Sequence, residues 1–337
     1  MSSHLPPPHV QVMQMGTAYW ASSVVFAAAE LGLADHLTEP KSAAELAGGL
    51  GLHAPTLHRL MRTLASLGLL TERSEKRFAL TPLGAALKSD AAGSARATVR
   101  TLAGPTFTRA FENIVSSLQT GKTGFEKAHG APIFEYLASH PAEASLFSET
   151  MVGIHGNEPP AVAAGYDFSA FETVVDVGGA TGNMLASILA KHAKPRGVLF
   201  DRPHVVSEAP ALLRAKGAHE RVTIQSGDFF ESIPAGGDAY VLSHILHDWS
   251  EEECLTILRN CRKAMKPTAR LLIVEMVLPD GDTPHLGKML DMVMLVVPGG
   301  QERTESEYVP LLAKAGFRLS RVVPTESAVS VVEALPA

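Results

Sequence analysis

Five short apolar runs in the second half of the chain constrain the fold more than any other feature. Each run is four or five residues long, and a segment with helical periodicity separates it from the next. The runs are 173–177, 197–200, 221–225, 239–242 and 270–274. Strands that alternate with helices are joined by right-handed crossovers, which produce a parallel sheet with helices on both faces. We therefore predict a doubly wound, Rossmann-like α/β domain.

The amino-terminal part of the chain follows a different pattern, in which helices precede a small hairpin. Apolar residues recur at helical spacing over 17–37, with a break expected at 31–33, and residues 42–45 have the sequence of a capping box. A helix over 56–67 leads into an alternating segment, 69–81, that predicts a hairpin. The order of helix, turn, helix and hairpin is the outline of a winged helix.

These patterns divide the chain into three predicted parts. The length of 337 residues is about twice that of a usual single domain, which favours more than one folded unit. The parts are an all-α, winged-helix-like domain (1–100), a helical connector and lid (101–165) and the α/β domain (166–337). With 46% hydrophobic and 19% charged residues, the composition is that of a globular protein rather than a disordered or fibrous one.

Charge and cysteine content exclude several classes of protein. The net charge of −6 gives the whole molecule no electrostatic attraction for nucleic acid or for anionic membranes. The two cysteines, Cys254 and Cys261, lie on one predicted helix, where roughly 10 Å of rise prevents a disulfide. Residues 18–29 are apolar but too few to span a bilayer, and they lack a basic flank. We expect a cytoplasmic protein without a signal peptide or membrane span, whose partner is a small molecule.

A glycine-rich turn, 178–182, follows the first apolar run. Glycines at a strand-to-helix turn let a ligand approach the backbone at the carboxyl edge of the sheet. Asp201 ends the second run, where a carboxylate can accept both hydroxyls of a ribose, while Asp228 and Phe229 offer a carboxylate and a ring to a base. The turn lacks the third glycine of the dinucleotide motif, so a nucleoside cofactor suits it better than NAD. Asp176, just before the turn, either caps it or contacts the cofactor.

A histidine and a glutamate follow the fourth and fifth apolar runs. His247 comes shortly after the fourth run, and Glu275 directly follows the fifth. Both therefore stand at the carboxyl ends of predicted parallel strands and should face the same crevice as the glycine turn. We interpret His244, Asp248 and Glu305 as surface or hydrogen-bonded residues.

Six motifs stand in a fixed order along the chain: 176–182, 200–205, 227–230, 245–249, Glu275 and 298–304. In this order they resemble the plant-type small-molecule O-methyltransferases and their bacterial relatives, over nearly the whole chain. The resemblance implies a class I methyltransferase domain that binds S-adenosylmethionine and releases S-adenosylhomocysteine, with no metal. It also implies a homodimer formed through the winged-helix domain. The implied acceptor is a hydroxyl, expected to be phenolic, of a small aromatic or polyketide-like natural product.

The resemblance also implies roles for individual residues. His247 matches the general base, and Glu275 and Glu302 match the two carboxylates that flank and orient it. The residues that match cofactor contacts are Gly178, Asp201, Asp228, Phe229 and Trp249, and Asp176 and Ser243 are added as candidates. Ser243 stands where the plant enzymes usually have a lysine near the cofactor, and Ala180 replaces a glycine of the motif.

Two segments supply candidates for acceptor binding. The methionines of 289–294 are core residues by default, although adaptable thioethers at the crevice also suit a flat aromatic substrate. The candidates are Asp291, Met292 and Met294, together with Met151, Ile154 and His155 from the predicted lid. The segment 291–299 is one residue shorter than in the plant pattern and matches the bacterial branch, so plant substrate contacts are not carried over.

Methyl transfer to oxygen needs alignment and a stronger nucleophile. The reaction is an in-line displacement at a sulfonium-bound carbon, and alignment contributes roughly 7 to 11 kcal/mol in favourable cases. A neutral phenol is a poor nucleophile at pH 7, and a histidine base typically adds about 10²- to 10⁴-fold. A carboxylate on the other ring nitrogen fixes the tautomer and stabilises the cation that forms.

Two alternatives stay open at this point. Residues 41–96 hold eight Lys and Arg against four Asp and Glu, as a winged-helix DNA-binding regulator would, but the presumed recognition helix offers only His58, Arg59 and Arg62 among apolar residues. A family relative recruited to a non-methylating reaction would keep the fold and the cofactor. The complete set of one histidine and two glutamates favours methyl transfer.

Overall fold

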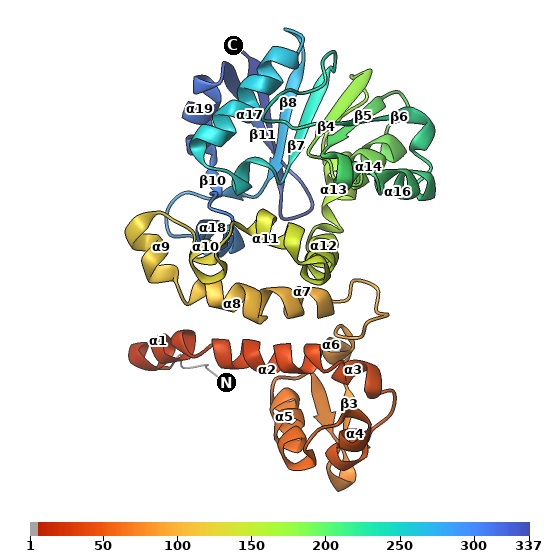
Figure 1. The fold of residues 1–337 in the computed structure, drawn as a ribbon, viewed down its shortest axis with the longest axis vertical. Helices are drawn as coiled ribbons and strands as arrows, with labels where there is room; N and C mark the ends of the chain where they lie inside the picture. The colour runs from red at the N-terminus through yellow and green to blue at the C-terminus, as the bar shows by residue number, and fades with distance from the viewer. Residues whose placement is uncertain (1–5) are drawn as a thin grey trace. The chain divides into compact units, whose positions relative to one another are not determined.

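The computed structural model describes residues 6–337, and these residues form two compact units (Figure 1). The first unit runs to Glu112 and resumes over Glu135–Gly156, and the second holds Asn113–Phe134 and Asn157–Ala337. Helices of the segment expected as a connector and lid, 101–165, belong to both units, and the predicted domain boundaries stay predictions.

The first unit is mainly helical and contains a small antiparallel sheet of strand order β1-β3-β2. Its helices are α1 (Pro8–Gly16), α2 (Tyr19–Glu30), α3 (Leu33–His36), α4 (Ala43–Leu50), α5 (Ala54–Ser66), α6 (Pro82–Ala85), α7 (Arg96–Leu102), α8 (Pro105–Phe111) and α12 (Pro141–His155), while α11 (Ile133–Ser139) crosses the division between the units. Its strands are β1 (Lys41–Ser42), β2 (Leu70–Glu72) and β3 (Arg77–Leu80), with the 3-10 turn η1 (Ser74–Lys76) between the last two.

The predicted order of helix, turn, helix and hairpin is confirmed in α4, α5, β2 and β3. Ser42 accepts the main-chain N–H of Glu45 and the Glu45 carboxylate accepts that of Ser42, so the predicted capping box forms. The predicted break falls at Gly32, whose φ of +60° separates α2 from α3. Met61 and Leu64, spaced for one face of α5, are buried in the core of the unit.

The second unit is an α/β domain with a seven-stranded sheet. Its strands are β4 (Thr173–Val177), β5 (Arg196–Asp201), β6 (Val222–Ser226), β7 (Ala239–Ser243), β8 (Arg270–Glu275), β11 (Phe317–Pro324) and β12 (Ser330–Pro336), and a separate short pair is formed by β9 (Val277–Leu278) and β10 (Arg303–Thr304). Its helices are α9 (Ile114–Thr120), α10 (Gly124–His129), α13 (Glu158–Gly165), α14 (Asn183–Lys191), α15 (Pro203–Val206), α16 (Ala209–Ala215), α17 (Glu251–Ala264), α18 (Leu286–Val296) and α19 (Glu305–Lys314), with 3-10 turns η2 (His219–Arg221) and η3 (Leu246–Asp248).

The sheet has the strand order β11-β12-β8-β7-β4-β5-β6. The five predicted runs are confirmed as β4 to β8, which pair in parallel. The two carboxy-terminal strands pair antiparallel, so the sheet is mixed rather than wholly parallel as expected. Strand β4 has β5 on one side and β7 on the other, so the strand order reverses there. Ligands of such sheets bind beyond the carboxyl ends of the strands at this point.

Alternate residues of the strands face two different layers of helices (Figure 1). Val174 and Val241 belong to one core, which includes residues of α14 and α16. Val175 and Leu242 belong to the other, which includes residues of α17 and α19. The strands are therefore buried on both faces, which leaves their carboxyl edge as the place for a site.

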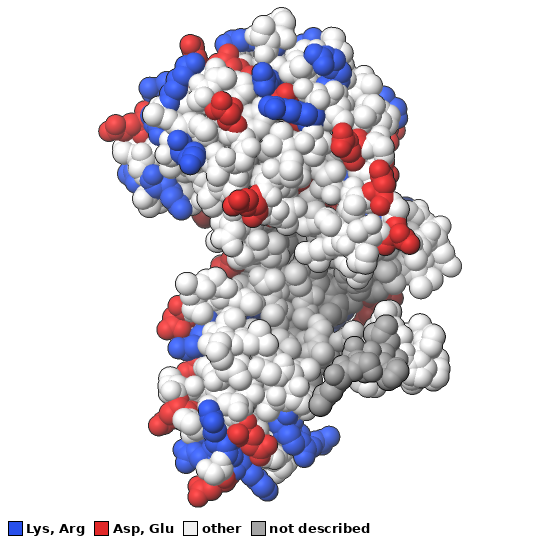
Figure 2. Space-filling model, turned by 180° about the vertical axis from the view of Figure 1, so that it is seen from behind, with Lys and Arg blue, Asp and Glu red and all other residues white. Residues whose placement is uncertain are grey.

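The helices and the surface charges of the described residues bear on two classes of protein, those that span a membrane and those that bind nucleic acid. Among the helices of residues 6–337, none combines the length and the apolar character that a bilayer crossing needs. On the face that Figure 2 presents, basic and acidic side chains are interspersed rather than gathered by sign. That face offers no basic stripe for a nucleic-acid backbone.

Candidate active site

The glycine turn after β4 is packed too closely for side chains at two of its positions. Gly178 has φ +71°, and a Cβ there would lie 2.4 Å from Cδ1 of Ile245. A Cβ on Gly179 would lie 2.5 Å from the carboxyl group of Asp176. Ile245 comes two residues before His247, so the turn and the loop after β7 touch. Glycine is required here by close approach and by the left-handed backbone.

Two carboxylates stand at, or just beyond, the carboxyl ends of the neighbouring strands β5 and β6. Oδ2 of Asp201, the last residue of β5, accepts the main-chain N–H of Ala180 at 2.8 Å. Asp228, which follows β6, accepts the main-chain N–H of Phe230 at 2.9 Å and pairs with the Arg202 guanidinium at 2.9 Å. Both aspartates are half-buried.

Aromatic rings lie next to these carboxylates. The Trp249 ring contacts Phe229 at a centroid distance of 6.0 Å and Phe230 at 4.9 Å, both edge to face. The side-chain amide of Asn260, on α17, donates to the carbonyl oxygens of Phe229 and Phe230 at 2.9 Å each. The loop after β6 is thereby fixed to α17, with its rings beside Asp228.

Asp176 lies beneath the turn and is 1% exposed. Neither of its carboxyl oxygens has a well-formed hydrogen bond within residues 6–337. Burial, with a smaller contribution from the charge of Asp201, raises the pKa of Asp176 to about 7. A buried polar group of this kind is usually satisfied by a ligand or an ordered water.

His247 belongs to the 3-10 turn η3 and is 6% exposed. Its Nδ1 lies 2.7 Å from Oε1 of Glu302, and its Nε2 lies 3.7 Å from Oδ1 of Asp248. A carboxylate oxygen only accepts, so Nδ1 carries a proton toward Glu302. In the neutral ring, Nε2 is then the nitrogen that is able to take up a proton.

Glu275 and Glu302 both contact His247, but at different groups. Glu275 is fully buried, and its Oε1 accepts the main-chain N–H of His247 at 3.0 Å. Its Oε2 accepts the hydroxyl of Tyr308. Glu302 holds the imidazole ring, whereas Glu275 holds the main chain that carries the ring. Tyr308 was missed by the sequence reasoning, because nothing in its local sequence marks it.

The segment before β10 is pressed against the same turn. A Cβ on Gly300 would lie 1.8 Å from the carbonyl oxygen of His247, and that oxygen accepts the main-chain N–H of Gln301 at 2.8 Å. The buried guanidinium of Arg303 donates to the carbonyl oxygens of Leu246 and Gln301 at 3.3 and 3.1 Å. These contacts bring Glu302 to the ring of His247.

Carboxylates dominate the electrostatics of His247. Burial by itself lowers the pKa of His247, but the carboxylates of Asp248, Glu302 and Glu275 outweigh burial and raise that pKa to about 10. Burial raises the pKa of Glu302, although the contact with His247 acts against this. Asp248, interpreted from the sequence as a surface or hydrogen-bonded residue, is thus an electrostatic partner of His247.

The remaining candidates are distributed over several places. Ser243 is half-buried at the end of β7. Asp291 accepts the main-chain N–H of Glu302 at 2.9 Å, so it supports Glu302 from α18. On the same helix Met294 is buried, Met292 is half-buried and Met289 is 67% exposed, which contradicts the default core reading for Met289. Met151, Ile154 and His155 lie on α12 in the first unit, and their role stays a prediction.

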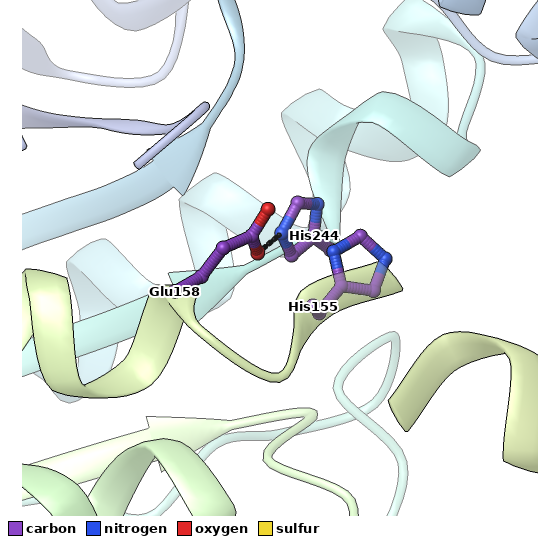
Figure 3. Close-up of side chains that lie close together, drawn as sticks. All are labelled: His155, Glu158 and His244. Carbon is purple, nitrogen blue, oxygen red and sulfur yellow. Dashed lines mark hydrogen bonds and ion pairs between the residues drawn. The ribbon is translucent and has the colours of Figure 1, made fainter. Parts of the chain in front are cut away.

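His244 is hydrogen-bonded, as interpreted from the sequence, but its place was not foreseen. Its Nε2 lies 2.6 Å from Oε2 of Glu158 (Figure 3), and its ring centroid is 5.1 Å from that of His247. Glu158 stands 86 positions away in the sequence, which left no local signal for the pair. Glu305, the first residue of α19, is exposed as expected.

Comparisons with known proteins find O-methyltransferases among the relatives of this chain. The chain is 44% identical over 326 residues to a phenazine O-methyltransferase of Lysobacter antibioticus, covering 96% of this chain and 95% of the relative. It is similar to the structure of a mitomycin 7-O-methyltransferase, with a TM-score of 0.92 at 36% identity over 98% of both chains. A third relative is an O-methyltransferase from neocarzinostatin biosynthesis, solved with S-adenosylmethionine and 2-hydroxy-5-methyl naphthoic acid (TM-score 0.83, 32% identity, 94% of this chain and 96% of that one).

Two family models match the chain itself. The model of the O-methyltransferase domain matches residues 111–318, and that of the O-methyltransferase dimerisation domain matches residues 13–90. The first match alone spans more than half of the 337 residues. The chain therefore belongs to the O-methyltransferase family and carries both its catalytic domain and its dimerisation domain.

Proposed function

We propose that this enzyme transfers the methyl group of S-adenosylmethionine to a hydroxyl, phenolic in type, of a small aromatic natural product, with His247 as general base. The observation that carries the proposal is the buried His247–Glu302 pair in a loop that touches the glycine turn through Ile245. A proton acceptor and a nucleoside-binding turn thus stand at one edge of the sheet.

The residues around the turn fit S-adenosylmethionine. Its nucleoside would lie against Gly178 and between the half-buried carboxylates of Asp201, which contacts the turn, and Asp228, which follows β6. Phe229 and Trp249 would border the base, and Asp176 would gain the polar partner it lacks. Ser243 is our further candidate on the side of β7. When bound, the cofactor supplies an electrophilic methyl group and a neutral leaving group, S-adenosylhomocysteine.

The chain's own contribution is to hold and move a proton. In its neutral form the His247 ring accepts the proton of the acceptor hydroxyl at Nε2, and the oxygen becomes a stronger nucleophile, an effect of about 10²- to 10⁴-fold. Because the pKa of the ring is about 10, we expect the rate to rise with pH toward that value. Glu302 at Nδ1 fixes the tautomer and stabilises the imidazolium. Glu275 keeps the turn in place through the main-chain N–H of His247.

Relatives support an aromatic acceptor. Two relatives are named as a phenazine O-methyltransferase and a mitomycin 7-O-methyltransferase, and a third was solved with 2-hydroxy-5-methyl naphthoic acid. We place the acceptor beside α18, with Asp291, Met292 and Met294, and keep Met151, Ile154 and His155 of α12 as predicted contacts. The dimerisation domain supports a homodimer as the working form. A cytoplasmic location stays a prediction.

The test uses methyl-labelled S-adenosylmethionine and a panel of phenols, hydroxyquinones and hydroxylated heterocycles. We expect label in at least one hydroxylated aromatic compound and none in its O-methyl ether. Matched aromatic amines form the second arm of the panel. Transfer to amines alone would make the enzyme an N-methyltransferase, and cofactor binding without transfer to any acceptor would favour a relative recruited to another reaction.

A further inference from the structure

A second histidine–glutamate pair, of a half-buried histidine and a buried glutamate, stands beside the His247–Glu302 pair. His244 directly follows β7, and Glu158 is the first residue of α13. Nε2 of His244 lies 2.6 Å from Oε2 of Glu158, and the two side chains are 17% and 8% exposed. Figure 3 shows the Glu158 carboxylate directed at the His244 ring. The rings of His244 and His247 have centroids 5.1 Å apart and are tilted by 48°.

The backbone of His244 has an uncommon conformation. Its φ is +53°, in the left-handed region that few residues other than glycine adopt. Its main-chain N–H still donates to the carbonyl oxygen of Val274 at 3.0 Å, so the pairing of β7 with β8 ends at this residue. The left-handed step turns the chain out of the strand and into η3, where His247 meets Glu275. Strained backbone of this kind gathers at functional sites, where the surroundings must hold it.

We propose that His244 is a positioning residue: held by Glu158, it fixes the turn from β7 into η3 and sets the charge next to the His247 ring. The inference rests on the proposed function, because it concerns how the base is held. The contact with α13 prevents the turn from relaxing to an ordinary right-handed conformation. Relaxation would displace Nε2 of His247 from the acceptor, and small misplacements at a reacting centre cost about 10²-fold in rate.

The pair also contributes charge at short range. Within the described residues of the second unit, the other charged or titratable groups bonded to the His247 turn or to its carboxylates are Asp248 on η3, Cys254 on α17, Glu275 on β8, Glu302 before β10, Arg303 on β10, Tyr308 on α19 and Asp291 on α18. Groups separated by about 5 Å in a partly buried site interact strongly. Removing the negative charge of Glu158 should lower the pKa of His247. Removing His244 leaves the Glu158 carboxylate without its histidine, and this should raise the pKa of His247.

The experiment compares Glu158→Gln and His244→Gly with a matched control. Glutamine keeps an oxygen for the hydrogen bond but not the charge, and glycine tolerates the left-handed φ but removes the ring. The control is His192→Asn. His192 is a half-buried histidine whose Nε2 lies 2.9 Å from the carbonyl oxygen of Ala163, and it follows the carboxyl end of α14, at the opposite edge of the sheet.

We expect His244→Gly to lower kcat by about 10- to 100-fold with the affinity for S-adenosylhomocysteine nearly unchanged. Glu158→Gln should lower kcat less and shift the acid limb of its pH profile to lower pH, while His244→Gly shifts that limb to higher pH. His192→Asn should change neither. If the pair had a purely structural role, both variants would lower the melting temperature, but the acid limbs of their kcat–pH profiles would not shift in opposite directions.

A measurement without turnover keeps this inference separate from the proposed function. The ring pKa of His247 is followed by NMR in the enzyme without ligands, in wild type and in both variants. Equal ring pKa values in all three proteins, together with wild-type kcat in His244→Gly, would overturn the inference. Absence of methyl transfer in the wild type would contradict the proposed function, and the NMR shifts would still test the pair.

Discussion

The two halves of the carboxyl edge of the sheet are built in different ways. The first half lies beyond β4, β5 and β6, where Asp201 and Asp228 are half-buried and accept the main-chain N–H groups of Ala180 and Phe230. Beyond β7 and β8 the charged groups are out of water, with His247 6% exposed, Glu275 0% and Glu302 1%. We assign cofactor binding to the first half, whose carboxylates are partly exposed. The second half holds charges in a dry environment and sets protonation, because burial and neighbouring charges shift pKa values most there.

The largest expected effect is a loss of turnover without a loss of cofactor affinity, which would distinguish the roles of the two halves. His247→Gln should lower kcat by about 10²- to 10⁴-fold, because an amide cannot take up the acceptor proton. The affinity for S-adenosylhomocysteine, measured by calorimetry, should stay nearly the same, because the glycine turn and the carboxylates are untouched. Wild-type turnover in this variant would remove His247 from its role and would place the base elsewhere.

The pH dependence of stability should come mainly from the second half. The pKa of His247 is about 10 in the folded protein, above its ordinary value of 6.5. The stabilisation from its carboxylate neighbours is therefore fully present below pH 6.5 and is lost as the pH rises through 10. We expect the free energy of unfolding to fall between pH 7 and pH 10 by more in the wild type than in His247→Gln. Urea unfolding at several pH values measures this, and parallel curves would contradict it.

A change in the first half should affect binding before turnover. Gly178→Ala places a Cβ 2.4 Å from Ile245 and at a φ of +71°, so either the turn or Ile245 must shift. The strain is on the order of 1–3 kcal/mol, which corresponds to about a 10- to 100-fold loss of affinity for S-adenosylhomocysteine. Gly217→Ala is the matched control, because Gly217 also has a positive φ but no atom within 4 Å of its Cβ. Equal losses in both variants would show a general backbone effect.

The smallest expected effect tests the one buried carboxyl group that we place in the first half. The pKa of Asp176 is raised to about 7 by burial and by Asp201, so its contribution to stability is present below pH 3.8 and is lost as the pH rises through 7. Asp176→Asn should therefore raise the melting temperature at pH 8 by about 2–4 °C, and by less at pH 5. The exposed Asp282→Asn serves as the control. A lower melting temperature in Asp176→Asn at pH 8 would mean that the ionised carboxylate has a stabilising partner.

The core of the fold was predictable because its signals are local. The strands β4, β5, β7 and β8 are short apolar runs, since both faces of these strands are covered by helices. The edge strand β6 is more polar and has no buried residue. The two carboxy-terminal strands, β11 and β12, were not predicted, and for β11 there is a physical reason. β11 is an edge strand with mostly partly exposed residues, including Arg318 and Arg321, and it lacks an apolar run. Its antiparallel pairing with β12 made the sheet mixed.

The sequence predicted which residues of the candidate site stand at the carboxyl ends of strands, but not which atoms those residues contact. Parallel strands bring their carboxyl ends to one edge, so His247, Glu275 and Asp201 could be assigned to it from spacing alone. The contact of Glu302 with Nδ1, the contact of Glu275 with a main-chain N–H and the pairing of Glu158 with His244 join segments 28 to 86 positions apart. No periodicity in the sequence encodes which atoms of such residues meet.

The sequence by itself determined the α/β class, the positions of the five main strands along the chain, the glycine turn and the edge at which the histidine stands. These features follow from local periodicity and from the direction of parallel strands. Only the tertiary structure decided how the histidine is held. The left-handed step at His244, the carboxylates around His247 and the unpartnered carboxyl group of Asp176 within residues 6–337 depend on packing between distant segments. Burial and charge act through space, and both set the proton affinity on which methyl transfer would depend.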